Sequence, residues 1–126
     1  MFEVSVEYSF CAGHALRNYK GKCENVHGHN YRVRVCVAGE KLDEAGLLVD
    51  FSELKSSLRA LVERLDHQFL NDLEPFNTLN PSAENLAKYI SDRMGAQYQE
   101  GNFRLREVTV WETDATSVTY RPAETS

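Results

Sequence analysis

Residues 2–10 read FEVSVEYSF, an unbroken alternation of apolar and polar side chains. Successive side chains of an extended chain point to opposite faces, so this period of two predicts a strand with one face buried. The alternation resumes from His29 to Val37 and predicts a second strand. The polar stretch between them, which includes Gly13 and Gly21, is then the loop that joins two neighbouring strands.

A helix is expected after the second strand, because the apolar period changes there. From Ser52 to Leu65, leucine and valine recur at helical spacing with charged side chains between them. Either Asp50 or Ser52 can accept hydrogen bonds from the first free amides of this helix and act as its N-cap.

A second helix and two more strands complete the expected order. The helix is predicted to begin at Asn80-Pro81, since proline at the first helical position gives up no needed hydrogen bond, and to stop at Gly95 or Gly101. Alternation predicts strands at 107–112 and 117–120. The order ββααββ predicts an α+β fold, a four-stranded antiparallel sheet with two helices on one face.

Composition narrows the class of protein. A chain of 126 residues predicts a single domain over residues 1–126, and 42% apolar with 26% charged residues are typical of a water-soluble fold. No apolar run reaches the roughly 20 residues of a membrane-spanning helix, and no leader peptide is expected. The formal net charge of -5 argues against a protein that coats nucleic acid. Three cysteines, an odd number, favour reduced thiols in a cytoplasmic protein.

Three of the four histidines gather in a short stretch, at His14, His27 and His29. His27 and His29 point to the same side of an extended chain, and His14 follows the neighbouring strand. Three neutral imidazoles without a fourth protein ligand are typical of a catalytic zinc site, which keeps one position for water or substrate. The alternative is a surface turn at His27-Gly28-His29, with His14 hydrogen-bonded in the loop.

Cys23 is the candidate reactive thiol. It lies four residues before His27 and beside Lys22. A nearby ammonium group or metal ion lowers the pKa of a thiol, so that the thiolate becomes available as base or nucleophile. The alternative is a small buried apolar side chain, which is the interpretation given to Cys11 and Cys36.

Asp66 and His67 form a candidate acid–base pair at the end of the first helix. A carboxylate bonded to an imidazole fixes the tautomer of the ring and raises its basicity, so the pair can take a proton from a thiol. Adjacent helical residues point about 100° apart, and direct contact therefore needs an irregular turn. The alternative is that His67 caps the C-terminus of the helix.

Glu112 is a polar residue at an apolar position. It continues the buried side of a strand after Val108 and Val110, where an unpaired carboxylate is costly. Either the strand end leaves it in solvent, or it meets a ligand with two parallel N–H groups. A pterin or guanine ring offers such a pair.

Taken together, six segments resemble the 6-pyruvoyl-tetrahydropterin synthase family and, within it, the bacterial 6-carboxytetrahydropterin synthase branch. They occur in the family's order over nearly the whole chain. They are Phe10–His14, Cys23–Tyr31, Val49–Phe51, Leu65–His67, Pro81–Asn85 and Trp111–Thr113. The short spacing from Cys23 to His27 favours the bacterial branch, whereas Cys11 stands where the family usually has serine.

The resemblance implies the tunnelling fold, an oligomeric barrel in which trimers stack as a homohexamer and active sites lie at subunit interfaces. It also implies a bound zinc ion and a role for each matching residue. These roles are zinc ligands at His14, His27 and His29, a catalytic base at Cys23, its activation by Asp66 and His67, and a pterin anchor at Glu112 helped by the backbone around Ser82 and Ala83.

The implied reaction converts 7,8-dihydroneopterin triphosphate to 6-carboxy-5,6,7,8-tetrahydropterin, acetaldehyde and triphosphate, on the route to the tRNA base queuosine. The substrate is a small molecule, and neither nucleic acid nor a membrane is expected as a partner. Arg17, Lys20, Lys22 and the strand arginines are candidates for holding the triphosphate.

Three alternatives stay open. Glu24 matches a branch in which glutamate replaces cysteine as the base and 6-hydroxymethyl-7,8-dihydropterin is made for folate synthesis, so a dual-function enzyme is the first. A non-catalytic protein that binds zinc and a pterin is the second, and Cys23 argues against it because a binder needs no thiol near the metal. A generic zinc hydrolase is the third, and it would leave Glu112 without a role.

Overall fold

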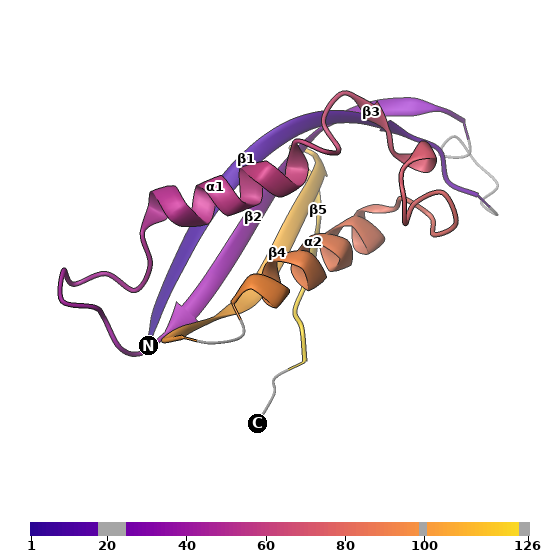
Figure 1. Cartoon of the computed structure of the whole chain (residues 1–126). Helices are drawn as coiled ribbons and strands as arrows, with labels where there is room; N and C mark the ends of the chain where they lie inside the picture. The colour runs from indigo at the N-terminus through magenta and orange to yellow at the C-terminus, as the bar shows by residue number, and fades with distance from the viewer. Residues whose placement is uncertain (18–24, 99–100, 124–126) are drawn as a thin grey trace.

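The chain folds into one layer of strands covered by one layer of helices (Figure 1). The computed structural model describes residues 1–17, 25–98 and 101–123. Its five-stranded sheet has the order β3-β1-β2-β4-β5. The elements are β1 (Phe2–His14), β2 (His27–Gly39), α1 (Phe51–Val62), β3 (Gln68–Phe69), the short 3-10 helix η2 (Leu70–Asp72), α2 (Ala83–Gln97), β4 (Phe103–Thr113) and β5 (Thr116–Tyr120).

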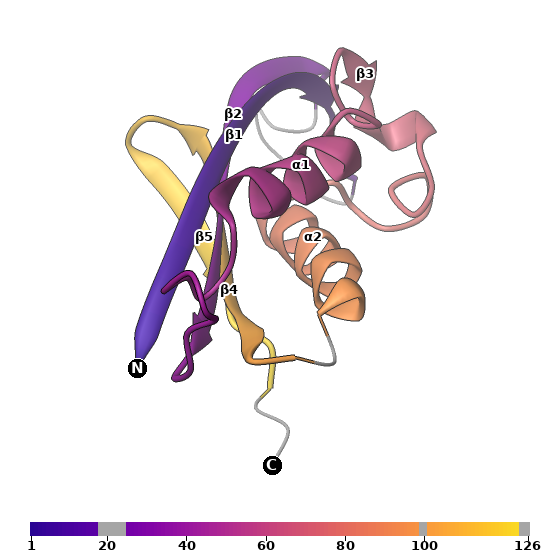
Figure 2. The ribbon, with the colours of Figure 1, turned by 60° about the vertical axis from the view of Figure 1, so that its left-hand side comes forward.

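Both α-helices cover the same face of the sheet (Figure 2). α1 packs against β1, and α2 packs against β4 and β5. The buried side chains of α1, Leu54, Leu58, Leu61 and Val62, follow the helical spacing of its leucines and join those of the sheet in one hydrophobic core. None of the helices in the described ranges is long and apolar enough to cross a membrane.

The α+β class and the helices on one face are confirmed, and the expected strand count of four is wrong by one. The extra strand, β3, has two residues and pairs in parallel with β1 at Ala12 and Gly13. It forms because the chain leaves α1 along the outer edge of β1. Such a short segment has no alternation for a sequence pattern to detect.

The helix ends differ in part from the expected ones. Asp50 is the N-cap of α1, and its side chain accepts a hydrogen bond of 2.7 Å from the Ser52 amide. α2 begins two residues later than Pro81, because the Ser82 hydroxyl caps it by accepting from the Asn85 amide. Gly95 lies inside α2, which ends at Gln97.

Candidate metal centre

The pairing of β1 with β2 brings the histidines together. His14 lies opposite His27 in the register, two positions beyond the pair of Ala12 and His29. Side chains at alternate positions share a face, so all three imidazoles project to the side on which Tyr31 is fully buried. The face is therefore the one covered by the helices.

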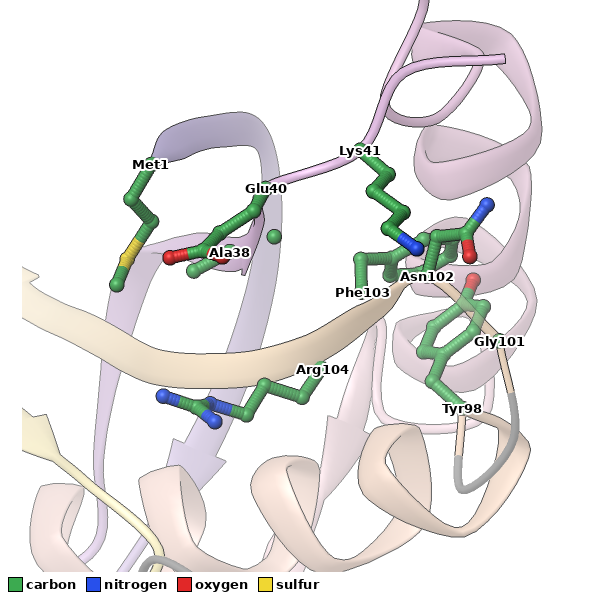
Figure 3. A pocket seen from close by; sticks show the side chains of 10 residues that line it. Met1, Ala38, Glu40, Lys41, Tyr98, Gly101, Asn102, Phe103 and Arg104 are labelled. Carbon is green, nitrogen blue, oxygen red and sulfur yellow. The ribbon is translucent and has the colours of Figure 1, made fainter.

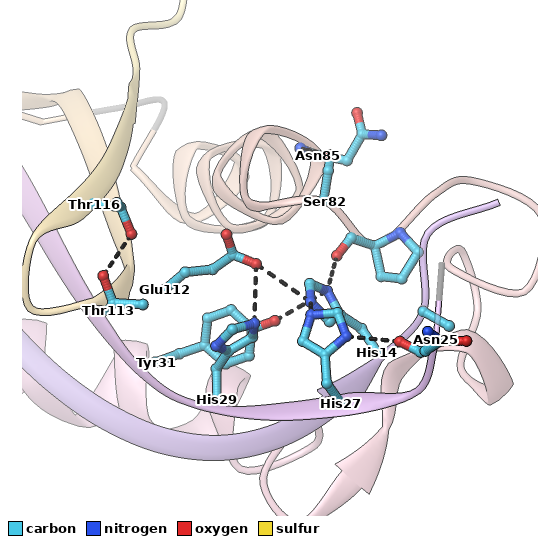
Figure 4. Close-up of polar contacts among 12 residues, drawn as sticks. His14, Asn25, His27, His29, Tyr31, Ser82, Asn85, Glu112, Thr113 and Thr116 are labelled. Atoms are coloured by element: carbon cyan, nitrogen blue, oxygen red, sulfur yellow. Dashed lines mark hydrogen bonds and ion pairs between the residues drawn. The ribbon is translucent and has the colours of Figure 1, made fainter. Parts of the chain in front are cut away.

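Glu112 reaches the same face from β4. It follows Val110, which is fully buried, by two positions, and a register irregularity lies between Trp111 and Thr113. Its side chain is 30% exposed and faces the histidines (Figure 4). The expectation that Glu112 continues the buried side of its strand is confirmed by this placement.

The nitrogen and oxygen atoms of these four side chains converge on one point. One potential ligand atom from each residue lies within 4.8 Å of all the others. The Nε2 atoms of His14 and His27 are 2.8 Å apart. Oε1 of Glu112 is 3.3 Å from Nε2 of His14 and 3.4 Å from Nε2 of His29.

Two backbone carbonyls fix the tautomers of the rings. Nδ1 of His14 lies 2.7 Å from the Pro81 oxygen, and Nδ1 of His27 lies 2.7 Å from the Asn25 oxygen. A carbonyl oxygen only accepts, so we assign a hydrogen to each Nδ1 and a lone pair to each Nε2. Nε2 of His29 is buried without a hydrogen-bond partner. The Nε2 lone pairs of His14 and His27 therefore face each other, beside Nε2 of His29 and the Glu112 carboxylate, an arrangement that a cation stabilises.

Burial favours the neutral form of two of the rings. It lowers the pKa of His14, although the hydrogen bond to Pro81 opposes this effect, and it likewise lowers the pKa of His29. Burial also raises the pKa of Tyr31, whose protonated hydroxyl lies 3.1 Å from Nδ1 of His14. Neutral imidazole is the form that binds metal. Together with Glu112 the rings form a nitrogen and oxygen donor set that fits a divalent cation such as zinc.

The residues that orient the rings were not found from the sequence. Asn25 and Pro81 act through backbone carbonyls, which any residue has, so no side-chain pattern indicates them. Tyr31 was counted as an apolar strand residue and as the end of the segment Cys23–Tyr31, without a role at the site. Its signal was its position two residues after His29, on the same face.

Asp66 and His67 contact each other directly. Their Oδ1 and Nδ1 atoms are 3.0 Å apart. The contact is reached outside the helix, since α1 ends at Val62 and His67 has a left-handed φ of 59°. This is the irregular turn that the sequence required.

The main chain of Cys11 holds the pair against β1. Its amide donates to Asp66 Oδ1 at 2.9 Å, and its carbonyl accepts from the His67 amide at 2.6 Å. The Cys11 amide and, to a smaller extent, His67 lower the pKa of Asp66. The His67 side chain is 79% exposed, and no hydrogen bond or ion pair between described residues connects the pair to the histidine cluster.

The remaining candidates divide into three groups. Cys23, Glu24, Lys20 and Lys22 lie outside the described residues. Ser82 caps α2 with its hydroxyl, and Ala83 is buried at the start of that helix. Arg17 donates to the carbonyl of Phe76 at 2.9 Å, so its guanidinium binds the backbone of a loop.

The strand arginines lie on the opposite face of the sheet. The guanidinium carbons of Arg32 and Arg34 lie 4.1 and 5.3 Å from the ring centroid of Trp111. Arg32 pairs with Trp111 across β2 and β4, whereas His29 and Tyr31 alternate to the other face. The structure therefore does not place them beside the histidine cluster.

Comparison with known proteins places this chain in one family. The sequence model of the family described as 6-pyruvoyl tetrahydropterin synthase matches residues 3–123. The 6-carboxy-5,6,7,8-tetrahydropterin synthase of Synechocystis is 37% identical over 95% of this chain and 93% of its own. The human 6-pyruvoyl tetrahydrobiopterin synthase is 36% identical over 94% of this chain and 90% of its own.

A solved structure agrees with the sequence comparisons. The 6-pyruvoyl tetrahydropterin synthase of Caenorhabditis elegans superposes with a TM-score of 0.82 at 32% identity and covers 98% of both chains. The chain belongs to the 6-pyruvoyl tetrahydropterin synthase family. Its relatives are named as tetrahydropterin synthases, which indicates an enzyme that acts on a small pterin.

Proposed function

We propose that the protein is a zinc-dependent 6-carboxy-5,6,7,8-tetrahydropterin synthase, a carbon–carbon lyase that acts on 7,8-dihydroneopterin triphosphate. The observation that carries the proposal is the convergence of the His14, His27 and His29 ring nitrogens beside Glu112. The bacterial relatives with this product in their names support the choice of product.

The four clustered side chains divide the work at the site. His14, His27 and His29 would hold the cation, since their ring nitrogens converge and burial favours the neutral form of His14 and His29. A bound zinc ion supplies Lewis acidity that lowers the pKa of substrate hydroxyl groups. Glu112 accepts the parallel N–H groups of the pterin ring and so positions the side chain of the substrate over the cluster.

Proton transfer falls to residues outside the cluster. Cys23 moves a proton of the substrate side chain, and the Asp66–His67 pair accepts the thiol proton. The hydrogen bond of His67 Nδ1 to Asp66 leaves Nε2 of His67 as the basic atom. Because this exposed pair makes no described hydrogen bond or ion pair with the histidine cluster, we propose that it serves the site of a neighbouring subunit.

The sheet provides edges for such an assembly. Among the described residues, β1 pairs on its outer side only through Ala12 and Gly13, and β5 ends the sheet at the other side. Unpaired edges of this kind associate with other strands. We propose that edge-to-edge pairing closes the barrel of a trimer, that trimers stack as a homohexamer, and that the enzyme works in the cytoplasm in queuosine synthesis.

The test is an anaerobic incubation of the zinc-loaded protein with 7,8-dihydroneopterin triphosphate, with the pterins resolved by chromatography and mass spectrometry. We expect 6-carboxytetrahydropterin and acetaldehyde in equal amounts. Cys23→Ala should keep the metal and lose turnover, whereas His27→Ala should lose both. Intact substrate, or 6-pyruvoyl-tetrahydropterin as product, would overturn the proposal. A 6-hydroxymethyl product that disappears in Glu24→Gln would show the dual-function enzyme.

A further inference from the structure

A groove of about 540 Å³ lies between α1 and α2, apart from the histidine cluster. The two helices pack side by side across the sheet (Figures 1 and 2). The groove involves the C-terminal half of α2, whereas Pro81, which contacts His14, precedes the N-terminus of that helix. Its described lining consists of Ser56, Ser57, Ala60, Leu61, Arg64, Arg93, Ala96 and Gln97.

One buried tyrosine orients both arginines of the groove. Tyr89 is 8% exposed, and its hydroxyl accepts a hydrogen bond of 2.7 Å from Arg64. The guanidinium carbon of Arg93 lies 5.3 Å from the centroid of the same ring, a cation–π distance. The guanidinium groups of Arg64 and Arg93 thus both lie against the side chain of Tyr89.

No described carboxylate neutralises this pair. The lining contains no acidic residue, and neither arginine forms an ion pair within residues 1–17, 25–98 and 101–123. The adjacent acids are bound elsewhere: Asp92 lies 3.0 Å from the Lys88 amine, and Glu63 lies 2.8 Å from Arg59.

A second hollow, beside Met1 and Gly39, differs in this respect. It has a volume of about 500 Å³, and its lining includes Glu40 as well as Lys41 (Figure 3). Charges of both signs are therefore present there. An excess of positive charge without a counter-ion distinguishes the groove between the helices.

We propose that this groove binds a small oxyanion, a phosphate or a carboxylate group, between Arg64 and Arg93. Guanidinium groups bind such oxygens through paired N–H donors. The hydroxyls of Ser56 and Ser57 add two further donors from the same lining. The site is independent of the pterin reaction, since none of its residues belongs to the histidine cluster or the Asp66–His67 pair.

The test is calorimetric titration of the zinc-loaded protein with inorganic phosphate and, separately, with citrate at constant ionic strength. We expect binding of at least one anion, weakened about tenfold or more by Arg64→Gln and by Arg93→Gln. Arg59→Gln removes the same charge from α1 outside the groove and should change the affinity less than about twofold. Both arginines are exposed, so the variants should fold. Arg64→Gln also loses the hydrogen bond to the buried Tyr89 hydroxyl and should unfold at a slightly lower temperature, which a thermal scan measures separately from the anion affinity.

Several results would overturn the proposal. One is the absence of binding for both anions. Another is an equal loss of affinity in Arg59→Gln, which would mean that only the overall charge matters. The last is anion binding that is unchanged in Arg64→Gln and Arg93→Gln but is lost in His27→Ala, which would place the anion at the metal centre. The tighter of the two anions shows whether a phosphate or a carboxylate is the preferred group.

Discussion

The Nε2 atoms of His14 and His27 lie 2.8 Å apart although neither has a hydrogen to share. Both rings donate from Nδ1, to the carbonyls of Pro81 and Asn25, so two lone pairs face each other. The two residues are direct partners in the register of β1 and β2. Strand pairing therefore assembles a site for a cation, and the repulsion is relieved when a cation is bound.

Metal removal should lower stability. A ligand that binds only the folded state stabilises it by about 2.7 kcal/mol at a free concentration of 100 times Kd. We therefore expect EDTA to lower the thermal midpoint by roughly 5–15 °C relative to the zinc-loaded protein. Scanning calorimetry with and without EDTA measures the shift. In His27→Ala the midpoint should not respond to zinc, and an equal response in both proteins would show that zinc acts elsewhere.

Substitution of Glu112 separates a metal ligand from a pterin anchor. Only Oε1 faces the histidines, at 3.3 Å from His14, and the second oxygen points away from them (Figure 4). We expect Glu112→Gln to keep one metal ion per chain while kcat/KM falls about 100-fold, because the charged hydrogen bonds to the pterin are lost. Elemental analysis and steady-state kinetics check this. Glu107→Gln, on the same strand, should change neither quantity, and metal loss in Glu112→Gln would make Glu112 a ligand.

Alternation along β1, β2 and β4 was enough to predict the sheet and the shared face of the histidines. The period of two fixes which side chains point together, and His14, His27 and His29 obey it. The sequence could not show that Glu112 would come within 3.3 Å of His14, because β4 is separated from β1 by most of the chain. Such contacts depend on the order of the strands in the sheet, which local sequence patterns do not determine.

Two features that the sequence did not specify in detail depend on the backbone. The left-handed turn at His67 is adopted by a residue without the usual glycine signal, and it is stabilised by hydrogen bonds to Cys11. Proline 81 was expected inside α2, but the Ser82 hydroxyl provides a better N-cap and leaves the Pro81 carbonyl free for His14. A sequence pattern offers several residues that could cap a helix, and the contacts made in the folded protein decide which of them does so.

The Asp66 carboxylate should make stability depend on pH in acid. Its pKa is lowered in the folded protein, chiefly by the Cys11 amide. Its contribution is therefore complete above its ordinary value of 3.8 and is lost as the pH falls through the lower folded value. We expect Asp66→Asn to be less stable than the unmodified protein at pH 7, with the difference shrinking towards pH 2. Urea unfolding in EDTA measures it without metal release.

A constant difference between these two proteins across the pH range would contradict the role given to the carboxylate. Asp72→Asn serves as the control, because Asp72 lies in the same connection between the α-helices and makes no described side-chain hydrogen bond or ion pair. The stability of the Asp72→Asn variant should equal that of the unmodified protein at every pH.

Gly39 should be the strand glycine least tolerant of a side chain. A Cβ atom there would overlap the Asn102 carbonyl oxygen and come within 2.7 Å of a Leu48 methyl carbon. A backbone oxygen cannot move as a flexible side chain can, so we expect Gly39→Ala to lower the free energy of unfolding by about 1–3 kcal/mol. At Gly28 the nearest atom to such a Cβ is 3.7 Å away, an ordinary contact. Gly28→Ala should therefore change the free energy of unfolding by less than about 0.5 kcal/mol in EDTA. Equal losses in the two variants would mean that strand propensity, rather than the close approach to Asn102, decides the effect.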